Sequence, residues 1–325
     1  MTALQPDTPG VARPEISLVV PVYNGSRTIG DVVREIHEGF RGHSLEVVLV
    51  NDGSTDDSEA TCTALVEAYP GSVRLVQLAR NFGEHNAVLA GLQHTTGAYV
   101  GVLDDDGQHP AAEALRLFEA IRRMHCDVVY GRYRVKHHSW VRNVGSWLND
   151  HMATLLLKKP PGLYLSSFKV MNRFVVDALK QYRGARPYID GLIYRTTRNI
   201  EQIDVVHRER RSGQSNYGPR KLVQLWLDMF LNFSILPLRL AGVLGLACAV
   251  LSGVLMIVVV IDKLWFDPDI TMGVPTILIT VVFFAGVQLL ILGTVGEYLG
   301  RLFMDYSGTP QFIVRYVKGQ RHADG

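Results

Sequence analysis

Residues 99–110 read YVGVLDDDGQHP, an apolar run that passes directly into three consecutive aspartates. Residues 99–103 have the composition of a buried strand, and Pro110 is well placed in the first turn of a helix. In an extended segment Asp104 and Asp106 point to the same side, and three adjacent carboxylates repel one another unless a cation compensates. Carboxylate oxygens suit Mg²⁺ or Mn²⁺, which often bridge carboxylates to a substrate diphosphate. The alternative is an acidic turn that caps the helix.

Similar apolar runs alternate with helical patterns through the first part of the chain. Near-continuous apolar strands separated by helices indicate an α/β domain with a mostly parallel sheet covered on both faces. The predicted strands are Ile16–Val22, Leu45–Val50, Val73–Leu78, Tyr99–Leu103 and Asp127–Tyr130, and the predicted helices are Ile29–Phe40, Asp56–Ala68, Glu84–His94 and Ala111–Met124.

A polar cluster follows each of the first four predicted strands. The clusters are PVYNG (21–25), NDGSTDDS (51–58), RNFGEH (80–85) and DDDGQHP (104–110). Open α/β sheets bind ligands at the carboxyl ends of their strands, so these clusters are expected to converge on one crevice. The chain contains neither Gly-x-Gly-x-x-Gly nor Gly-x-x-x-x-Gly-Lys-Ser/Thr, which argues against a dinucleotide oxidoreductase and a P-loop phosphotransferase.

Two long uncharged runs, residues 240–261 and 274–296, lie near the C-terminus. Each is long enough to span the hydrocarbon core of a membrane as a helix, which predicts a transmembrane hairpin; the alternative is a pair of buried helices. Basic residues flank the hairpin, whereas the loop Asp262–Met272 is acidic. The positive-inside rule therefore places both termini and the α/β domain on the cytoplasmic side of the cytoplasmic (inner) membrane.

Between the two regions, residues 217–237 carry apolar side chains at three- and four-residue steps. This pattern predicts an amphipathic helix in the membrane interface, or alternatively one packed on the globular domain. The predicted organisation is a flexible N-terminus (1–15), an α/β domain (16–216), the interface helix (217–237), two transmembrane helices (238–300) and a cytoplasmic tail (301–325).

Composition narrows the function further. The 325 residues include 33 Lys+Arg and 31 Asp+Glu, a net charge of +2, which gives no support for nucleic-acid binding. The three cysteines, Cys62, Cys126 and Cys248, are widely separated and fit neither a disulfide framework nor a zinc site. They are expected to be reduced and buried.

Taken together, the motifs resemble the family 2 glycosyltransferases with the GT-A fold. The resemblance rests on Pro21–Asn24, Asn51–Asp56, Arg80–Gly83 and Asp104-x-Asp106-x-Gln108-x-Pro110. Arg210-x-x-Gly213-x-Ser215-x-Tyr217, the two apolar runs and Gly296–Arg301 are similar to the polyprenyl-phosphate glycosyltransferases. That group includes undecaprenyl-phosphate glucosyl and aminoarabinose transferases and dolichyl-phosphate mannose synthases.

The resemblance implies roles for individual residues. It assigns Asp106 and Arg210 to catalysis, and Asp104 and Asp106 to a bound Mg²⁺ or Mn²⁺. The residues implied to bind the nucleotide-sugar are Pro21, Tyr23, Asn24, Asp52, Arg80, Asp104, Asp105, Gln108 and Ser215. The residues implied to bind the acceptor phosphate are Arg134, Arg142, Ser146 and Lys169. Arg134 and Arg142 are alternatively solvated surface charges.

Three departures from the family pattern affect this interpretation. Gly25 stands where the family commonly has Glu, and Asn216 where it often has Lys. No Asp or Glu occurs between His151 and Val176, where many relatives have an acidic residue. A polyprenyl phosphate is already an anion at pH 7 and attacks the sugar C1 without a base, whereas an alcohol needs one. The missing acid therefore favours a phosphate acceptor.

The expected function is inverting transfer of a sugar from a nucleotide-sugar, with a UDP-sugar preferred, to undecaprenyl phosphate on the cytoplasmic leaflet. The resemblance also implies a homo-oligomer, in many relatives a tetramer. One alternative is a processive or other membrane family 2 enzyme that acts on a hydroxyl. Processive synthases usually carry Gln-x-x-Arg-Trp, but every Trp here follows Ser or Leu. A non-catalytic membrane scaffold is the other alternative.

Overall fold

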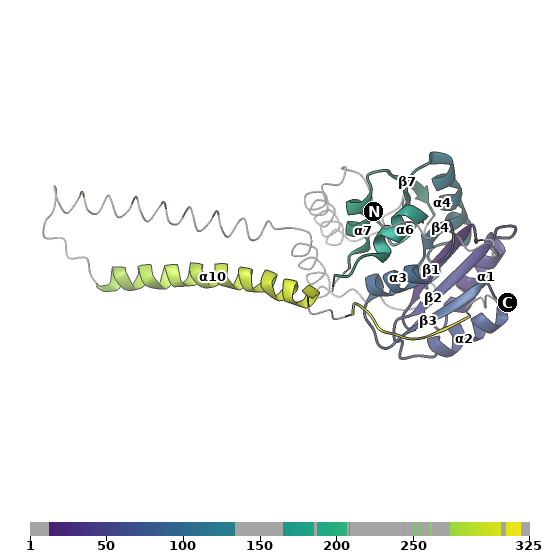
Figure 1. Ribbon diagram of the computed structural model, residues 1–325, viewed down its shortest axis with the longest axis horizontal. Coiled ribbons are helices and arrows are strands. Elements are labelled where there is room, and N and C mark those ends of the chain that lie inside the picture. Colours follow the sequence, from purple (N-terminus) through teal and green to yellow (C-terminus); the bar gives the residue numbers. More distant parts are fainter. Residues whose placement is uncertain are drawn as a thin grey trace. The chain divides into compact units, whose positions relative to one another are not determined.

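The computed structural model describes residues 13–133, 165–184, 187–206, 208, 274–306 and 310–319, together with single residues between 243 and 261 (Figure 1). The chain forms two units, one containing Met1–Gly218 and Pro310–Gly325 and the other containing Pro219–Thr309. Each unit is considered by itself.

The first unit is built on an eight-stranded sheet with the order β7-β5-β6-β4-β1-β2-β3-β8. β1 lies near the centre and pairs in parallel with β2 and β4, while β6 and β8 run antiparallel to their neighbours. The strands are β1 Ile16–Val22, β2 Leu45–Asn51, β3 Val73–Leu78, β4 Tyr99–Val102, β5 Val128–Tyr133, β6 Lys169–Asn172, β7 Ile200–Val205 and β8 Val314–Lys318.

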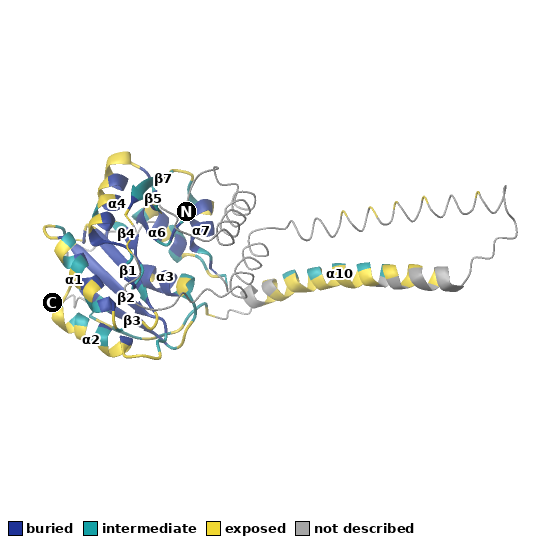
Figure 2. Cartoon of the chain, turned by 180° about the vertical axis from the view of Figure 1, so that it is seen from behind, coloured by how far each residue is buried: buried dark blue, intermediate teal, exposed yellow. Residues whose placement is uncertain are grey.

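Helices cover both faces of this sheet. They are α1 Ile29–Gly39, α2 Ser58–Ala68, α3 Glu84–Gln93, α4 Ala111–Met124, α6 Arg173–Lys180 and α7 Ile189–Thr196. Successive strand residues point to opposite faces, so Leu18 and Val20 join the core beneath α1, α2 and α4, whereas Val19 joins the core beneath α3, α6 and α7. The central strands are consequently buried on both sides, as Figure 2 shows.

The predicted elements agree closely with the structure. β1, β3 and α4 have the predicted bounds, the other ends differ by one or two residues, and only β5 extends further, to Tyr133. β6, α6, α7, β7 and β8 were not among the predicted strands and helices. β6 and β7 carry polar residues along much of their length and give no continuous apolar run.

Part of the segment predicted as a cytoplasmic tail is a strand of the sheet. β8 lies antiparallel to β3, and Phe312, Val314 and Val317 pack against the core beneath α3, α6 and α7. The backbone N–H of Ala79, just after β3, donates to the carbonyl of Ile313 over 2.9 Å. The chain therefore returns to the first unit after it leaves the second.

In the second unit, α10 runs from Val274 to Tyr306 and includes the predicted span 274–296. The predicted span 240–261 is described only at single positions, and the predicted helix 217–237 lies outside the described residues. Within the described part of the chain, no helix combines the length and hydropathy that a membrane crossing requires.

Gly91 allows α3 to approach the centre of the sheet. A Cβ at this position would lie 2.4 Å from Cγ1 of Val19 and 2.9 Å from Cγ2 of Val50, and neither valine can rotate away cheaply. We expect Gly91→Ala to lower the free energy of unfolding by about 1–3 kcal/mol through overpacking. Urea unfolding of the purified protein, followed by far-ultraviolet circular dichroism, measures the change.

Gly30→Ala is the matched control, because Gly30 is also helical but a Cβ there meets nothing within 4 Å. Helix propensity alone then makes this variant neutral or about 1 kcal/mol more stable. Equal behaviour of the two variants would show that α3 does not pack against the sheet as described.

Candidate active site

The loops that follow β1, β2 and β4 are joined by hydrogen bonds at one edge of the sheet. The backbone N–H of Tyr23 donates to Oδ2 of Asp105 over 3.2 Å. The backbone N–H of Asn24 donates to Oγ of Ser54 over 3.0 Å, and Oδ1 of Asn24 accepts from the N–H of Thr55 over 2.9 Å. The clusters that follow β1, β2 and β4 therefore converge, as predicted.

Asp52 links the end of β2 to the loop between β3 and α3. Its side chain is buried, and its two oxygens accept from the backbone N–H groups of Phe82 (2.7 Å) and Gly83 (2.9 Å). Burial raises the pKa of this carboxyl, while the two backbone donors lower it. Asp52 thus fixes the loop that carries Arg80, a role the sequence did not indicate.

Gly53 permits the loop between β3 and α3 to come unusually close to the loop that follows β2. It has a φ of +61°, and a Cβ there would lie 2.3 Å from the carbonyl carbon of Arg80. Only glycine satisfies both conditions without displacing the backbone. The Arg80 guanidinium lies 4.6 Å from the centre of the Phe82 ring, a cation–π contact that orients this cation at the edge.

Asp104 and Asp106 both follow β4, and each has one oxygen held by a neighbour. Oδ2 of Asp104 accepts from the hydroxyl of Ser167 over 2.9 Å. Oδ1 of Asp106, a buried side chain, accepts from the backbone N–H of Gln108 over 3.0 Å. Ser167 lies in the stretch without acidic residues, and its hydroxyl stands beside Asp104.

Asp105 turns toward the β1 loop. Burial raises the pKa of its carboxyl to about 7, the Tyr23 N–H opposes that change, and the charges of Asp104 and Asp106 add to it. A Cβ at Gly25 would lie 2.2 Å from Oδ2 of Asp105. The carboxylate therefore occupies the space that a larger residue at 25 needs, which accounts for glycine at this departure from the family pattern.

His109 stabilises the Asp104–Pro110 loop, a role that the sequence did not indicate. Its Nδ1 accepts from the backbone N–H of Asp104 over 3.2 Å, so Nε2 carries the hydrogen and donates to the Tyr133 hydroxyl over 2.6 Å. Its ring stacks on Phe168 with centroids 4.5 Å apart. Burial lowers the pKa of His109 to about 4, which keeps the imidazole neutral at pH 7.

Lys169, predicted to bind an acceptor phosphate, is buried and forms an ion pair with Asp190. The hydroxyl of Tyr130 donates to the same carboxylate oxygen over 2.8 Å. Lys169 lies beside Val102 of β4, and Asp190 lies in the first turn of α7. Sequence reasoning missed Asp190 because a single aspartate in a helical segment carries no motif.

Nine of the predicted site residues lie at this edge: Pro21, Tyr23, Asn24, Asp52, Arg80, Asp104, Asp105, Asp106 and Gln108. Five others, Arg134, Arg142, Ser146, Arg210 and Ser215, lie outside the described residues and stay predictions.

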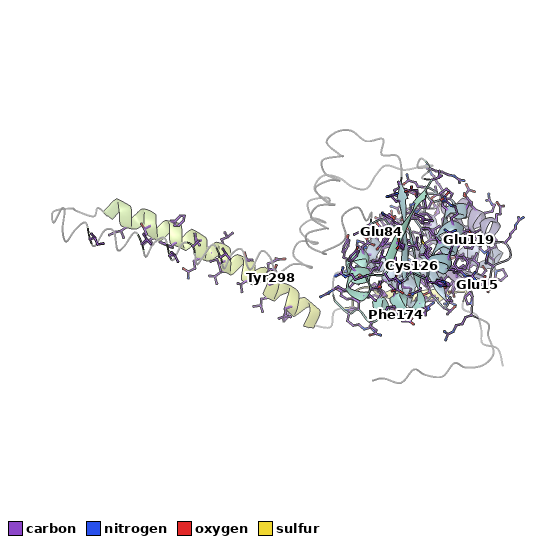
Figure 3. All side chains as sticks on the ribbon, turned by 90° about the horizontal axis from the view of Figure 1, so that it is seen from above. Glu15, Glu84, Glu119, Cys126, Phe174 and Tyr298 are labelled. Carbon is purple, nitrogen blue, oxygen red and sulfur yellow. The ribbon has the colours of Figure 1, made fainter. Side chains whose placement is uncertain are left out.

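Two of the three cysteines lie within the described residues. Cys62 and Cys126 are buried free thiols, and Figure 3 marks Cys126 within the first unit. Burial raises the pKa of Cys62 to about 12 and that of Cys126 to about 11. Both thiols stay protonated at pH 7, which makes them unreactive. The prediction that these two residues are buried is confirmed, whereas Cys248 lies outside the described residues.

A mostly parallel sheet that gathers carboxylates and backbone donors at the carboxyl ends of its strands is the architecture of a nucleotide-binding α/β enzyme. The family model for glycosyl transferase family 2 matches residues 17–179. The chain belongs to glycosyl transferase family 2, and the predicted family and glycosyltransferase activity are confirmed.

Curated relatives match almost the whole chain. One from Sodalis glossinidius (strain morsitans) is 31% identical over 309 residues, 94% of each chain. Another from Serratia proteamaculans (strain 568) is 32% identical over 311 residues, 94% of this chain and 95% of the relative. Both are named undecaprenyl-phosphate 4-deoxy-4-formamido-L-arabinose transferase.

Solved structures share the fold. Glucosyl-3-phosphoglycerate synthase from Mycobacterium tuberculosis, in complex with Mn²⁺, UDP and phosphoglyceric acid, has a TM-score of 0.52 at 19% identity. That match covers 67% of this chain and 78% of the synthase. The complex of the same enzyme with Mn²⁺ and UDP-glucose also has a TM-score of 0.52, at 20% identity over the same shares. The likeness confirms the predicted GT-A fold of the first unit.

The close approach at Gly53 leads to a testable outcome. We expect Gly53→Ala to displace the Arg80 loop and to lower the free energy of unfolding by more than the about 1–2 kcal/mol that backbone strain alone costs. Urea unfolding followed by circular dichroism measures the loss.

Gly71→Ala is the control, because Gly71 also has a positive φ, of +76°, but a Cβ there meets nothing within 4 Å. Its backbone strain costs about 1–2 kcal/mol of stability and displaces no neighbour. If Gly53→Ala is no less stable than Gly71→Ala, the backbones of Gly53 and Arg80 do not approach each other as described.

Proposed function

We propose that this enzyme transfers a sugar from a nucleotide-sugar, with a UDP-sugar preferred, to undecaprenyl phosphate with inversion at C1. The observation that carries the proposal is the set of hydrogen bonds that ties the β1, β2 and β4 loops together around Asp104 and Asp106. The names of relatives about 30% identical over nearly the whole chain supply the acceptor class.

Asp104 and Asp106 are the residues that would hold a divalent cation. Their oxygens are the hard donors that Mg²⁺ and Mn²⁺ prefer, and their fixed positions after β4 suit an Asp-x-Asp site. No three His, Cys, Asp or Glu side chains of the described residues form a ligand set of their own, so the donor's diphosphate would complete the coordination. A bound cation supplies positive charge beside the leaving diphosphate.

Other residues at this edge of the sheet are proposed to contact the nucleotide-sugar. Tyr23 is 40% exposed at the end of β1, which leaves its ring accessible for stacking on a nucleobase. Arg80, oriented by Phe82, supplies a cation for the phosphates. Arg210 and Ser215 are proposed to contact the same diphosphate, as the family pattern implies.

The acceptor phosphate needs positively charged side chains, and some of the predicted contacts already have partners within the protein. Lys169 pairs with Asp190, Ser167 donates to Asp104, and the Ser166 hydroxyl donates to the carbonyl of Gly131 over 2.9 Å. As the family pattern implies, we assign the acceptor phosphate chiefly to Arg134 and Arg142, with Ser146. The phosphate oxygen is already ionised, so its in-line attack on C1 requires no general base.

Attachment to the inner membrane is proposed through a hairpin of residues 240–261 and α10. The α10 side chains of Leu289, Leu299 and Phe303 are 69%, 62% and 69% exposed. Figure 3 marks Tyr298, of the same helix turn as Leu299. Large apolar side chains exposed along one helix mark a surface that binds lipid or protein. Cytoplasmic termini and a homo-oligomer complete the proposed organisation.

Asp106→Asn tests the cation site. Losing one charged oxygen donor is expected to reduce sugar transfer at least about 100-fold. Asp31→Asn, an exposed charge on α1 paired with Arg34, is the control and keeps parental activity. Full-length protein is incubated with undecaprenyl phosphate and a panel of nucleotide-sugars, and the lipid product is identified by mass spectrometry. Parental transfer by Asp106→Asn would contradict the cation site, and no lipid product from any donor would contradict the acceptor.

Replacing residues 219–309 by a flexible Gly/Ser linker tests the attachment. The variant retains β8, so the first unit is expected to fold and bind UDP, while it leaves the membrane fraction and loses transfer to undecaprenyl phosphate. Sedimentation and UDP titration measure the two properties. A variant truncated after Gly218, which lacks β8, is the comparison and should be less stable. Continued membrane sedimentation of the linker variant would show that attachment does not depend on the second unit.

A further inference from the structure

Arg208, just beyond β7, contacts both α1 and the Asp104–Pro110 loop. Its guanidinium nitrogen Nη1 donates to Oε1 and Oε2 of Glu35 over 2.9 and 3.0 Å. Its backbone N–H donates to the carbonyl of Gln108 over 3.1 Å, and the Gln108 side-chain amide donates back to the Arg208 carbonyl over 3.4 Å. One residue therefore connects a carboxylate on α1 to the middle of the Asp104–Pro110 loop.

Glu35 also holds the far end of that loop. Its Oε1 accepts from the backbone N–H of Ala111 over 3.3 Å, and Ala111 is the first residue of α4. A carboxylate at this position favours the helix start, because the first N–H groups of a helix lack backbone acceptors and carry partial positive charge. Glu35 thus bonds the residue that begins α4 and, through Arg208, the residue that supports Asp106.

These bonds form a connected path to a proposed cation ligand. The path runs from Glu35 to Arg208, from Arg208 to Gln108, and from the Gln108 backbone N–H to Oδ1 of Asp106. We propose that Glu35 and Arg208 are positioning residues that hold the Asp104–Pro110 loop in the shape that binds the divalent cation and donor diphosphate. This inference rests on the proposed cation site.

A surface ion pair by itself contributes little stability, and the side chains of Arg208 and Glu35 are 45% and 29% exposed. This pair differs from an ordinary one in its connections. Its partners are 173 residues apart in the chain; Arg208 bonds the Asp104–Pro110 loop, and Glu35 bonds the residue that follows it. Its loss is therefore expected to alter loop geometry, and with it cation binding, much more than global stability.

The experiment uses full-length protein in detergent with Mn²⁺ as the probe. Free Mn²⁺ is followed by electron paramagnetic resonance during titration in the presence of UDP, and melting temperatures are recorded in parallel. Glu35→Gln and Arg208→Gln are each expected to raise the Mn²⁺ dissociation constant about fivefold, the size of one lost ordinary hydrogen bond. The double variant should be no weaker than either single variant, because the two residues act as one unit.

Activity measurements add a second readout. The KM for the donor is expected to rise about as much as the Mn²⁺ dissociation constant, with kcat less affected, because the reacting groups themselves are unchanged. Arg208→Lys should be intermediate, since an ammonium keeps the charge but not the two-oxygen contact. Asp31→Asn, which breaks the Asp31–Arg34 pair one turn away on α1, should match the parent in both readouts.

Three outcomes would overturn the inference. These are parental Mn²⁺ binding by Glu35→Gln, weakening that only parallels a fall in melting temperature, and additive effects in the double variant. Asp106→Asn separates this result from the proposed function. If Asp106→Asn abolishes Mn²⁺ binding while Glu35→Gln does not weaken it, only the positioning role is wrong. If Asp106→Asn binds Mn²⁺ as the parent does, the cation site itself is wrong.

Discussion

The parallel pairing of β1 between β2 and β4 sets the geometry on which the rest of the site depends. Val22 of β1 lies opposite Asn51 of β2, so the two loops leave the sheet at the same level. β4 is offset, with Val102 opposite Val19, and the three aspartates therefore run alongside the last residues of β1. This register brings Oδ2 of Asp105 within 3.2 Å of the Tyr23 N–H. A shift of one residue would turn every side chain to the other face and separate the loops.

Within that frame, the three aspartates have different environments and therefore different roles. Asp105 is turned into the protein, where burial raises its pKa to about 7 and it holds the β1 loop. Asp104 and Asp106 each have one oxygen fixed, by Ser167 and by the Gln108 N–H. Three adjacent carboxylates repel one another without compensation, which is the physical reason to expect a cation at this loop. The neutral imidazole of His109 supports the loop without adding charge of its own.

Local pattern predicted the strands and helices of the first unit up to Met124 because each apolar run there is continuous and each loop has turn residues. Local pattern did not predict elements and contacts that depend on residues far apart in the chain. β8 follows the second unit in the chain, and no pattern in VRYVK names β3 as its partner. Asp190 pairs with Lys169 from an unremarkable helix, and Glu35 meets Arg208 across 173 residues. Such contacts depend on how distant elements pack, so a single sequence does not reveal them.

The sequence by itself determined the fold class, the family and the four loops assigned to the proposed site, since residue type and periodicity are properties of short segments. It also located the charge-free runs from which the membrane attachment is proposed. Only the tertiary structure decided which partner each loop residue contacts. Asp52 bonds the backbone of Phe82 and Gly83, Gly25 makes room for Asp105, and Ser167 stands beside Asp104. The reason is that a side chain's role depends on its burial and its partners, and both are fixed only when the strands are in register and the helices are packed.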